Sequence, residues 1–376
     1  MRRILTHIII VAVFAMSCRD PFNPPVIAQP NKFLVVDGYV NTTPGDTTYI
    51  TLSRTRNLVD SEQFSPEVRA TVTIESKGGQ VFHMLELGKG IYYLLSQAFI
   101  PGEDYRLHIR TYANSEYASA WVPNKVTPAI DSITWNKSDQ VSIYAFTHDP
   151  NNNTRYYRWD YDETWEYDAY FDSNLGWDNN RYSLYYKDSA DLTYRCYRHG
   201  KSQDIAIGTS ANLAQDVIDS QRVALVANAS ERISVKYSIL VKQFALTKDA
   251  FEYWQLLKKN SNQLGTIFDP QPSQVTGNMT CLSNPQEPVI GYISTSTVSR
   301  KRIFIHNYEV APWGFPSQER SCPVKILNDP DSAIYYLQDG KLGPAYYVTG
   351  GGLAIAPTIC IDCRTRGGST IKPDFW

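Results

Sequence analysis

The sequence has few of the residues that usually build catalytic and metal sites. Only six of its 376 residues are histidine and six are cysteine, and the histidines are scattered along the chain. It contains no G-x-S-x-G turn, no H-E-x-x-H motif, no phosphate-binding P-loop and no glycine-rich dinucleotide turn. These absences argue against the common hydrolase, zinc-protease and nucleotide-binding classes. We therefore expect a non-catalytic protein without a cofactor or a resident metal.

An excess of positive charge is also missing, as is any long apolar run beyond the N-terminus. The formal net charge is −2, which gives no electrostatic basis for binding nucleic acid. No stretch after residue 17 has the ~20 apolar residues that a membrane-spanning helix needs. Nucleic acid is therefore not expected as a partner, and the chain after residue 17 is not expected to cross a bilayer.

The first 17 residues have the pattern of a bacterial lipoprotein signal peptide. Arg2 and Arg3 precede a mostly apolar run that is too short to span a membrane, and Ala15 and Ser17 lie just before Cys18. A cysteine after a small residue at such a cleavage point is the position at which the thiol is acylated. The alternative is an ordinary signal peptide, with Cys18 free or in a disulfide. Lipidation of Cys18 predicts a membrane anchor, and residues 18–31 then form a proline-rich tether.

The remaining composition favours strands over helices. Tyrosine is abundant, with 26 residues, and tyrosine and threonine are common in strands. Residues 33–122 predict about seven short strands at sandwich spacing, with a hairpin at the "KGG" turn of residues 77–79. No pair of cysteines lies within this stretch. We therefore predict a mainly β protein that begins with an immunoglobulin-like β-sandwich at residues 32–125.

Residues 126–376 predict a larger β-rich domain with one or two amphipathic helices. Residues 232–245 are expected to form one long strand. A helix is expected to follow, from the N-cap Thr247 to the stop at Gly265, and residues 211–219 are a weaker second helix. The chain closes on Phe375 and Trp376 after a proline. Terminal residues are usually polar, so we expect a docked tail with both rings buried.

Residues 155–187 are the most unusual segment, with eight tyrosines, three tryptophans and seven acidic residues. If the strand is unbroken, alternation places Trp159, Tyr161, Glu163 and Trp165 on one face, opposite Arg158 and Asp160. One interpretation is an aromatic core layer. The other is a surface that binds a peptide or a sugar. The candidate residues of that surface are Tyr156, Trp159, Tyr161, Trp165, Tyr167, Tyr170 and Trp177.

Two asparagine- and aspartate-rich loops resemble calcium-binding loops only in part. The first offers Asp149, Asn151, Asn153 and Asp160, but it has proline at its second position and lacks the central glycine. The second offers Asp172, Asn174 and Asp178. Such residues are also ordinary turn formers, so turns are the favoured interpretation.

Five cysteines follow Cys18, so at least one thiol must remain unpaired within the chain. The sequence does not define the pairing. The Cys360–Cys363 motif lies between a proline and a glycine pair instead of at the start of a helix, which favours a structural staple over a redox site. Two cysteines alone are also weak evidence for a zinc site, because structural zinc is held by four ligands. The disulfide candidates are Cys196, Cys281, Cys322, Cys360 and Cys363.

Several phrases of the sequence resemble one known family. They are "FLVVDGYV", "YSILVKQFALTKDAFEYWQLLKKN", "GTIFDPQPSQVTGNMTC", "EPVIGYISTSTVSRKRIFI" and "CIDCRTRGGSTIKPDFW". Together with "SCRDPFNPP", they are similar to a family of Bacteroidota lipoproteins known as domain of unknown function 4249. The resemblance implies an exported, lipid-anchored, mostly β protein, encoded near TonB-dependent outer-membrane receptors. It implies no catalytic residue.

These observations lead to three hypotheses. The first is a non-catalytic lipoprotein of the outer membrane that captures a ligand for, or docks on, a TonB-dependent receptor. The second is an envelope-assembly protein without a small ligand, and the third is an enzyme of a type that the motifs do not identify. The sequence leaves open which leaflet carries the anchor.

Overall fold

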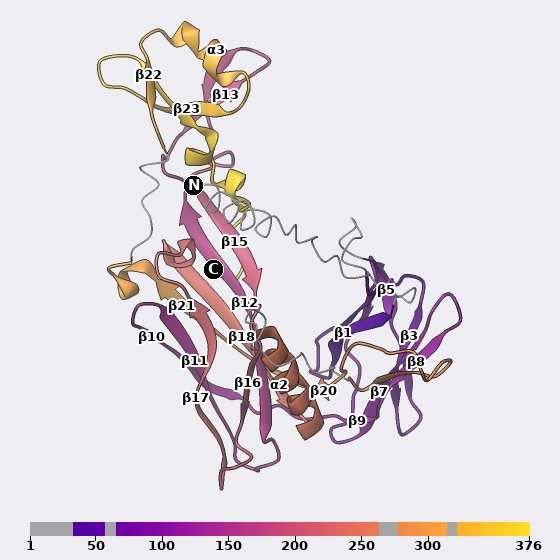
Figure 1. The fold of residues 1–376 in the computed structure, drawn as a ribbon. Helices are drawn as coiled ribbons and strands as arrows, with labels where there is room; N and C mark the ends of the chain where they lie inside the picture. Colours follow the sequence, from indigo (N-terminus) through magenta and orange to yellow (C-terminus); the bar gives the residue numbers. More distant parts are fainter. Residues whose placement is uncertain (1–32, 57–64, 263–276, 314–321) are drawn as a thin grey trace, which may run out of the picture.

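The computed structural model describes residues 33–56, 65–262, 277–313 and 322–376 (Figure 1). The described residues are mainly β and are arranged in several sheets, which confirms the predicted fold class. They include no helix that is both long and apolar enough to cross a membrane. The predicted signal peptide, the tether and Cys18 lie outside the described residues.

The N-terminal region is a sandwich of two sheets. One sheet contains β1 (Leu34–Asn41), β2 (Thr48–Arg54), β5 (Leu85–Gly88) and β6 (Ile91–Leu94). The other contains β3 (Thr71–Ser76), β4 (Val81–His83), β7 (Asp104–Arg110), β8 (Glu116–Ser119) and β9 (Val122–Pro123). The extended segment after the turn at residues 77–79 breaks at the buried Met84, because β4 and β5 belong to different sheets. Between the sheets lies an apolar core that includes Leu34, Ile50, Ile74, Tyr92 and Leu107.

This sandwich is completed by strands from much later in the chain. β19 (Met279–Cys281) pairs with β8, and β20 (Thr295–Ser296) runs parallel to β1. The chain around the expected domain boundary is itself paired: Lys125 bridges to Ser296, and the Thr127 N–H donates to Thr297 Oγ1 at 2.8 Å. The chain therefore returns across the boundary that the sequence places near residue 125.

A second sandwich forms the centre of the molecule. Its three-stranded sheet contains β10 (Ile130–Lys137), β11 (Val141–Asp149) and β17 (Asp216–Val226). The facing sheet, called the central sheet here, has the order β15 (Arg195–Lys201), β12 (Tyr156–Asp168), β18 (Lys236–Leu246) and β21 (Val298–His306), and β16 (Ala206–Thr209) also pairs with β12. Both sheets contribute to one large core.

Two expectations for this region were wrong. Residues 211–219 form no helix, because β17 begins at Asp216 and pairs along β11. The buried Asp216 carboxylate accepts from the Tyr157 hydroxyl at 2.8 Å, so tertiary contacts override the local helical preference. The long strand begins at Lys236 instead of residue 232, after the 3₁₀ turn η1 (Glu231–Ile233).

The predicted helix is α2 (Lys248–Asn262), which lies beside the central sheet in Figure 1. Thr247 caps it, since its Oγ1 accepts from the Ala250 N–H at 3.2 Å. Ala250 and Phe251 pack on Phe244 and Leu246 of β18. The expected stop at Gly265 lies outside the described residues.

A small module occupies the end of the central sandwich away from α2 (Figure 1). It consists of the hairpin of β13 (Leu175–Asp178) and β14 (Ser183–Tyr186), the strands β22 (Lys325–Leu327), β23 (Leu342–Tyr347) and β24 (Leu353–Pro357), and the short helix α3 (Ala333–Leu337). A separate apolar cluster that includes Leu175, Leu337 and Leu353 holds it together. We call it the end module.

Candidate binding groove

The aromatic segment is largely core. Alternation along β12 turns Tyr157, Trp159, Tyr161, Trp165 and Tyr167 inward, and each is at most 8% exposed. The Trp159 Nε1–H donates to Gln243 Oε1 at 2.8 Å, so its polar atom is satisfied inside the core. The core alternative therefore accounts for Trp159, Trp165 and Tyr167. Tyr161 is also mostly buried, but it contributes to the lining of the cavity described below.

The other three candidates of that surface have different surroundings. Tyr156 packs on Phe251 of α2, with 5.2 Å between ring centroids. Trp177 is partly buried against the end module. Tyr170 is 38% exposed and contacts Phe171 edge-on. None of the three lines the two cavities described below.

The outer face of β12 is polar and forms the floor of a groove. Arg158, Asp160 and Asp162 line a cavity of about 510 Å³ between the central sheet and the N-terminal sandwich. β1, β2, α2 and residues 201–205 form its walls. Ligand sites often lie at such junctions between domains. We call this cavity, together with the adjoining one described below, the groove.

The charges on the floor are paired. Arg158 Nη2 lies 2.8 Å from Asp160 Oδ2, and Lys242 Nζ of β18 lies 2.5 Å from Asp162 Oδ2. The Arg158 guanidinium also lies 4.2 Å from the centroid of the Trp254 ring, a cation–π arrangement that positions this indole. The first cavity is also lined by three exposed charged residues, Asp37, Lys201 and Asp204.

Aromatic side chains form the wall above this floor. Tyr253 and Trp254 of α2 meet at 5.5 Å between ring centroids, and Tyr253 lies 5.1 Å from Tyr292. Tyr39 of β1 also lines the cavity, and Tyr49 of β2 does so while 53% exposed. Burial raises the pKa of Tyr39 to about 12, and it also raises the pKa values of Tyr253 and Tyr292. These phenols therefore remain neutral at physiological pH and can both donate and accept hydrogen bonds.

Sequence reasoning missed the aromatic wall. Its members come from β1, β2, α2 and the segment after β19, so no local pattern connects them. The one signal is Gly38, within a strand. It has a φ of +138°, and a Cβ there would lie 2.5 Å from the Tyr49 carbonyl oxygen. A glycine inside a strand marks such a close approach, and here it breaks the alternation of β1 beside the groove.

A second cavity of about 380 Å³ adjoins the first, since Asp162 and Lys201 line both. Thr164, His199 and Arg302 also line it, and Thr164 Oγ1 is hydrogen-bonded to His199 Nδ1 at 2.8 Å. Its far end is formed by Phe375, whose ring centroid lies 3.6 Å from the Arg302 guanidinium. The groove thus follows the outer face of β12 as far as the C-terminal tail.

The tail lies across the central sheet. Ser369 exchanges backbone hydrogen bonds with Tyr197 of β15, and the Trp376 Nε1–H donates to Glu166 Oε2 at 2.7 Å. The Trp376 ring contacts Tyr197 and Phe304 edge-on. Phe375 remains 41% exposed, so the ring burial is less complete than expected.

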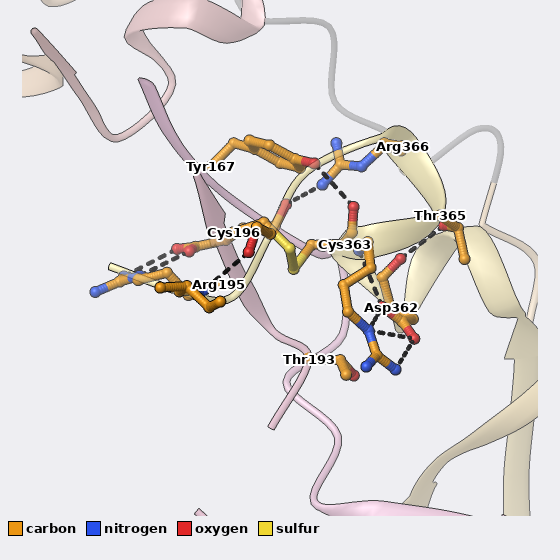
Figure 2. Close-up of a disulfide and its surroundings, with 12 residues drawn as sticks. Tyr167, Thr193, Arg195, Cys196, Asp362, Cys363, Thr365 and Arg366 are labelled. Atoms are coloured by element: carbon orange, nitrogen blue, oxygen red, sulfur yellow. Dashed lines mark hydrogen bonds and ion pairs between the residues drawn. A yellow bond between two sulfur atoms is a disulfide. The ribbon is translucent and has the colours of Figure 1, made fainter. Parts of the chain in front are cut away.

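Two disulfides lie at the base of the end module. Cys196 of β15 pairs with Cys363 of the 3₁₀ turn η6 (Cys363–Arg366), and Cys322 pairs with Cys360 of η5 (Thr358–Cys360). Figure 2 shows the first bond beside Tyr167, whose hydroxyl donates to the Cys363 carbonyl at 2.8 Å. Cys360 and Cys363 thus have separate distant partners. Cys281, which is buried, is the free cysteine among the described residues.

The two asparagine-rich loops form turns. The Asp149 carboxylate accepts from the N–H groups of Asn151, Asn153 and Thr154. Burial opposes ionisation of Asp149, but these hydrogen bonds outweigh it and lower its pKa. In the second loop, the Asp178 carboxylate accepts from the N–H of Asn180 at 2.8 Å. In the part of the chain that the structure describes, no group of three or more His, Cys, Asp or Glu side chains is placed to hold a metal ion.

Comparison with known proteins gives a family but no activity. No curated protein matches the chain. The family model described as "Domain of unknown function (DUF4249)" matches residues 19–302, which include β1 to β20 and most of the groove, but not the tail. Because the match covers more than half of the sequence, this chain belongs to the DUF4249 family.

Proposed function

We propose that this protein is a non-catalytic, lipid-anchored binding protein of the outer membrane that captures a ligand in the groove for a TonB-dependent receptor. The observation that carries the proposal is the groove itself. It combines a floor of paired charges with an aromatic wall at the junction of two sandwiches. Such a site suits binding, because it offers ring faces and polar side chains along one continuous surface.

Two further features support an exported and anchored protein. The two disulfides favour an oxidising compartment, since such bonds are rare in the cytosol. The Cys18 pattern supports acylation, and two or three acyl chains anchor a protein stably. The proposed anchor would leave the groove on a tethered body beside the membrane.

The membrane and receptor parts of this proposal have separate tests. Cys18→Ala should release the protein from the membrane fraction and abolish labelling with fatty acid, whereas Cys281→Ala should remain membrane-bound and labelled. Crosslinking on intact cells, followed by purification from outer membranes, should recover a TonB-dependent receptor in stoichiometric amount. If the crosslinks reach only envelope-assembly proteins, the receptor role is wrong. If the wild type takes up no fatty acid, the anchor is wrong.

A further inference from the structure

We propose that the groove binds a neutral oligosaccharide laid along the outer face of β12. This inference rests on the proposed function, because it names the ligand class of the same groove. Three properties of the groove carry it: its length, the pairing of its strands, and the chemistry of its lining.

The length of the groove calls for a chain-like ligand. The two cavities share Asp162 and Lys201 and together run from the aromatic wall to Phe375. Arg158 and Thr164 mark the two parts of the floor and are six positions apart on β12, a span of about 20 Å at ~3.3 Å per residue. A single sugar or amino acid would fill only part of this length.

The strands that form the floor of the first cavity and its wall from the N-terminal sandwich have their edges occupied. β12 lies between β18 on one side and β15 and β16 on the other, and β18 lies between β12 and β21. β2 lies between β1 and β6, and β1 is bonded to β2 and β20. An extended peptide is commonly held by adding a strand to an open sheet edge, and β1, β2, β12 and β18 offer none. β15 and β21 are the outer strands of the central sheet and line the second cavity. Recognition on the floor and on the β1–β2 wall of the first cavity must therefore use side chains.

The charges of the lining favour a neutral ligand. Arg158 and Lys242 are neutralised by Asp160 and Asp162. The other charged residues of the lining are of both signs in equal number: Asp37, Asp204, Lys201 and Arg302. Little net field therefore remains to attract a strongly charged chain. A carboxylate in an ion pair has further lone pairs that accept from hydroxyl groups. Additional polar partners for hydroxyls line the same cavity: Asp37, Thr51, Ser202, Gln203 and Asp204.

The apolar part of the lining consists mainly of rings. Tyr49, Tyr253, Trp254 and Tyr292 line the first cavity, whereas its aliphatic members are Val36, which is 3% exposed, and Ile205. A flat ring accepts the C–H face of a pyranose, and the phenol of a tyrosine adds a polar handle. An aliphatic side chain of a peptide would instead need a deeper apolar pocket. Rings beside hydroxyl-binding groups therefore match an oligosaccharide.

Calorimetric titration of the purified full chain tests this inference. The probes are maltohexaose, cellohexaose, mannohexaose and xylohexaose, alongside a library of capped hexapeptides. We expect at least one hexasaccharide to bind. Tyr49→Ala and Asp37→Asn should each weaken that binding by up to about tenfold, the scale expected for a lost ring contact or hydrogen bond. Tyr335→Ala is the matched control, because Tyr335 is 77% exposed on α3 of the end module.

The outcomes separate this inference from the proposed function. If hexapeptides bind instead of sugars, and Tyr49→Ala weakens them, the oligosaccharide inference is overturned while the capture function stands. If a sugar binds equally well to the wild type, Tyr49→Ala and Asp37→Asn, the assignment to this groove is overturned. If neither class of probe binds, the oligosaccharide inference and the capture part of the proposed function both fail, whereas the anchor and the receptor contact are decided by their own tests.

Discussion

The two faces of β12 differ sharply in burial and in charge. Trp159 on the inner face is 1% exposed, whereas the side chain of the next residue, Asp160, is 36% exposed and paired with Arg158. In the sequence, the aromatic and acidic residues form one feature. In the structure, the period of two along a strand separates that feature into a core and a groove floor. Composition alone therefore does not locate a binding site in such a segment.

The polar groups on the two faces of β12 also have different kinds of partners. Inward-facing polar groups are held by specific partners, as in the Tyr237 hydroxyl that donates to Glu163 at 2.8 Å. Outward-facing groups form ion pairs that remain partly open to solvent. Substitutions on the inner face should therefore affect stability, and those on the outer face should affect binding.

The largest effect is expected at Trp159. Trp159→Ala would leave a large cavity between the sheets and remove the N–H that donates to Oε1 of the fully buried Gln243. The free energy of unfolding should fall by about 3–5 kcal/mol, as for other large aromatics removed from cores. Urea unfolding followed by circular dichroism measures this change. A loss below about 1 kcal/mol would mean that the inner face is not a packed core.

Local patterns anticipated the features that depend on neighbours in the sequence. Alternation separated Trp159 and Tyr161 from Arg158 and Asp160, and Thr247 marked the start of α2. Local patterns did not predict that β19 and β20 return to the first sandwich, and they did not predict the partners of Cys360 and Cys363. Those features depend on contacts between residues far apart in sequence, for which one sequence carries no local signal. The aromatic wall was missed for the same reason.

The C-terminal tail covers part of the outer face of the central sheet with aromatic rings. Its removal should therefore cause an intermediate loss of stability. Deletion of residues 372–376 would remove the bond from Trp376 to Glu166 and the ring contacts with Tyr197 and Phe304. Each such aromatic pair contributes about 0.5–1.5 kcal/mol, so stability should fall by about 1–3 kcal/mol. Thermal unfolding and limited proteolysis measure the change.

A matched control for the deletion is Ile371→Ala. Ile371 is 78% exposed, so this variant should unfold and digest like the wild type. If the truncated chain also behaves like the wild type, the tail contacts contribute nothing to the fold.

The buried Glu163 on the inner face of β12 should make the stability of the protein depend on pH. It is 2% exposed, and burial raises the pKa of its carboxyl above the ordinary 4.5, although the Tyr237 hydroxyl and Arg232 favour the charged form. A raised pKa means that the folded state holds the proton more tightly. Its contribution to stability is therefore present below pH 4.5 and is lost as pH rises through the folded pKa.

Glu163→Gln removes this titration, so the wild type should lose stability relative to the variant as the pH rises from acidic to neutral. Urea unfolding over that range measures the difference. Glu252→Gln on α2, where the Glu252 side chain is 59% exposed, should follow the wild-type profile. Parallel profiles for the wild type and Glu163→Gln would contradict the role given to burial.

The smallest effect on stability is expected at Asp160, which follows Trp159 directly on β12. Asp160→Asn removes the charge that pairs with Arg158, but Arg158 keeps its contacts with the Trp254 and Phe244 rings. Partly exposed ion pairs contribute about 0–1 kcal/mol, so the free energy of unfolding should change by no more than that in the same urea assay. Sugar affinity should fall, because the floor loses an ionised acceptor for hydroxyl groups. A loss of stability as large as that of Trp159→Ala would show that Asp160 serves the core, and the division between the two faces of β12 would then be wrong.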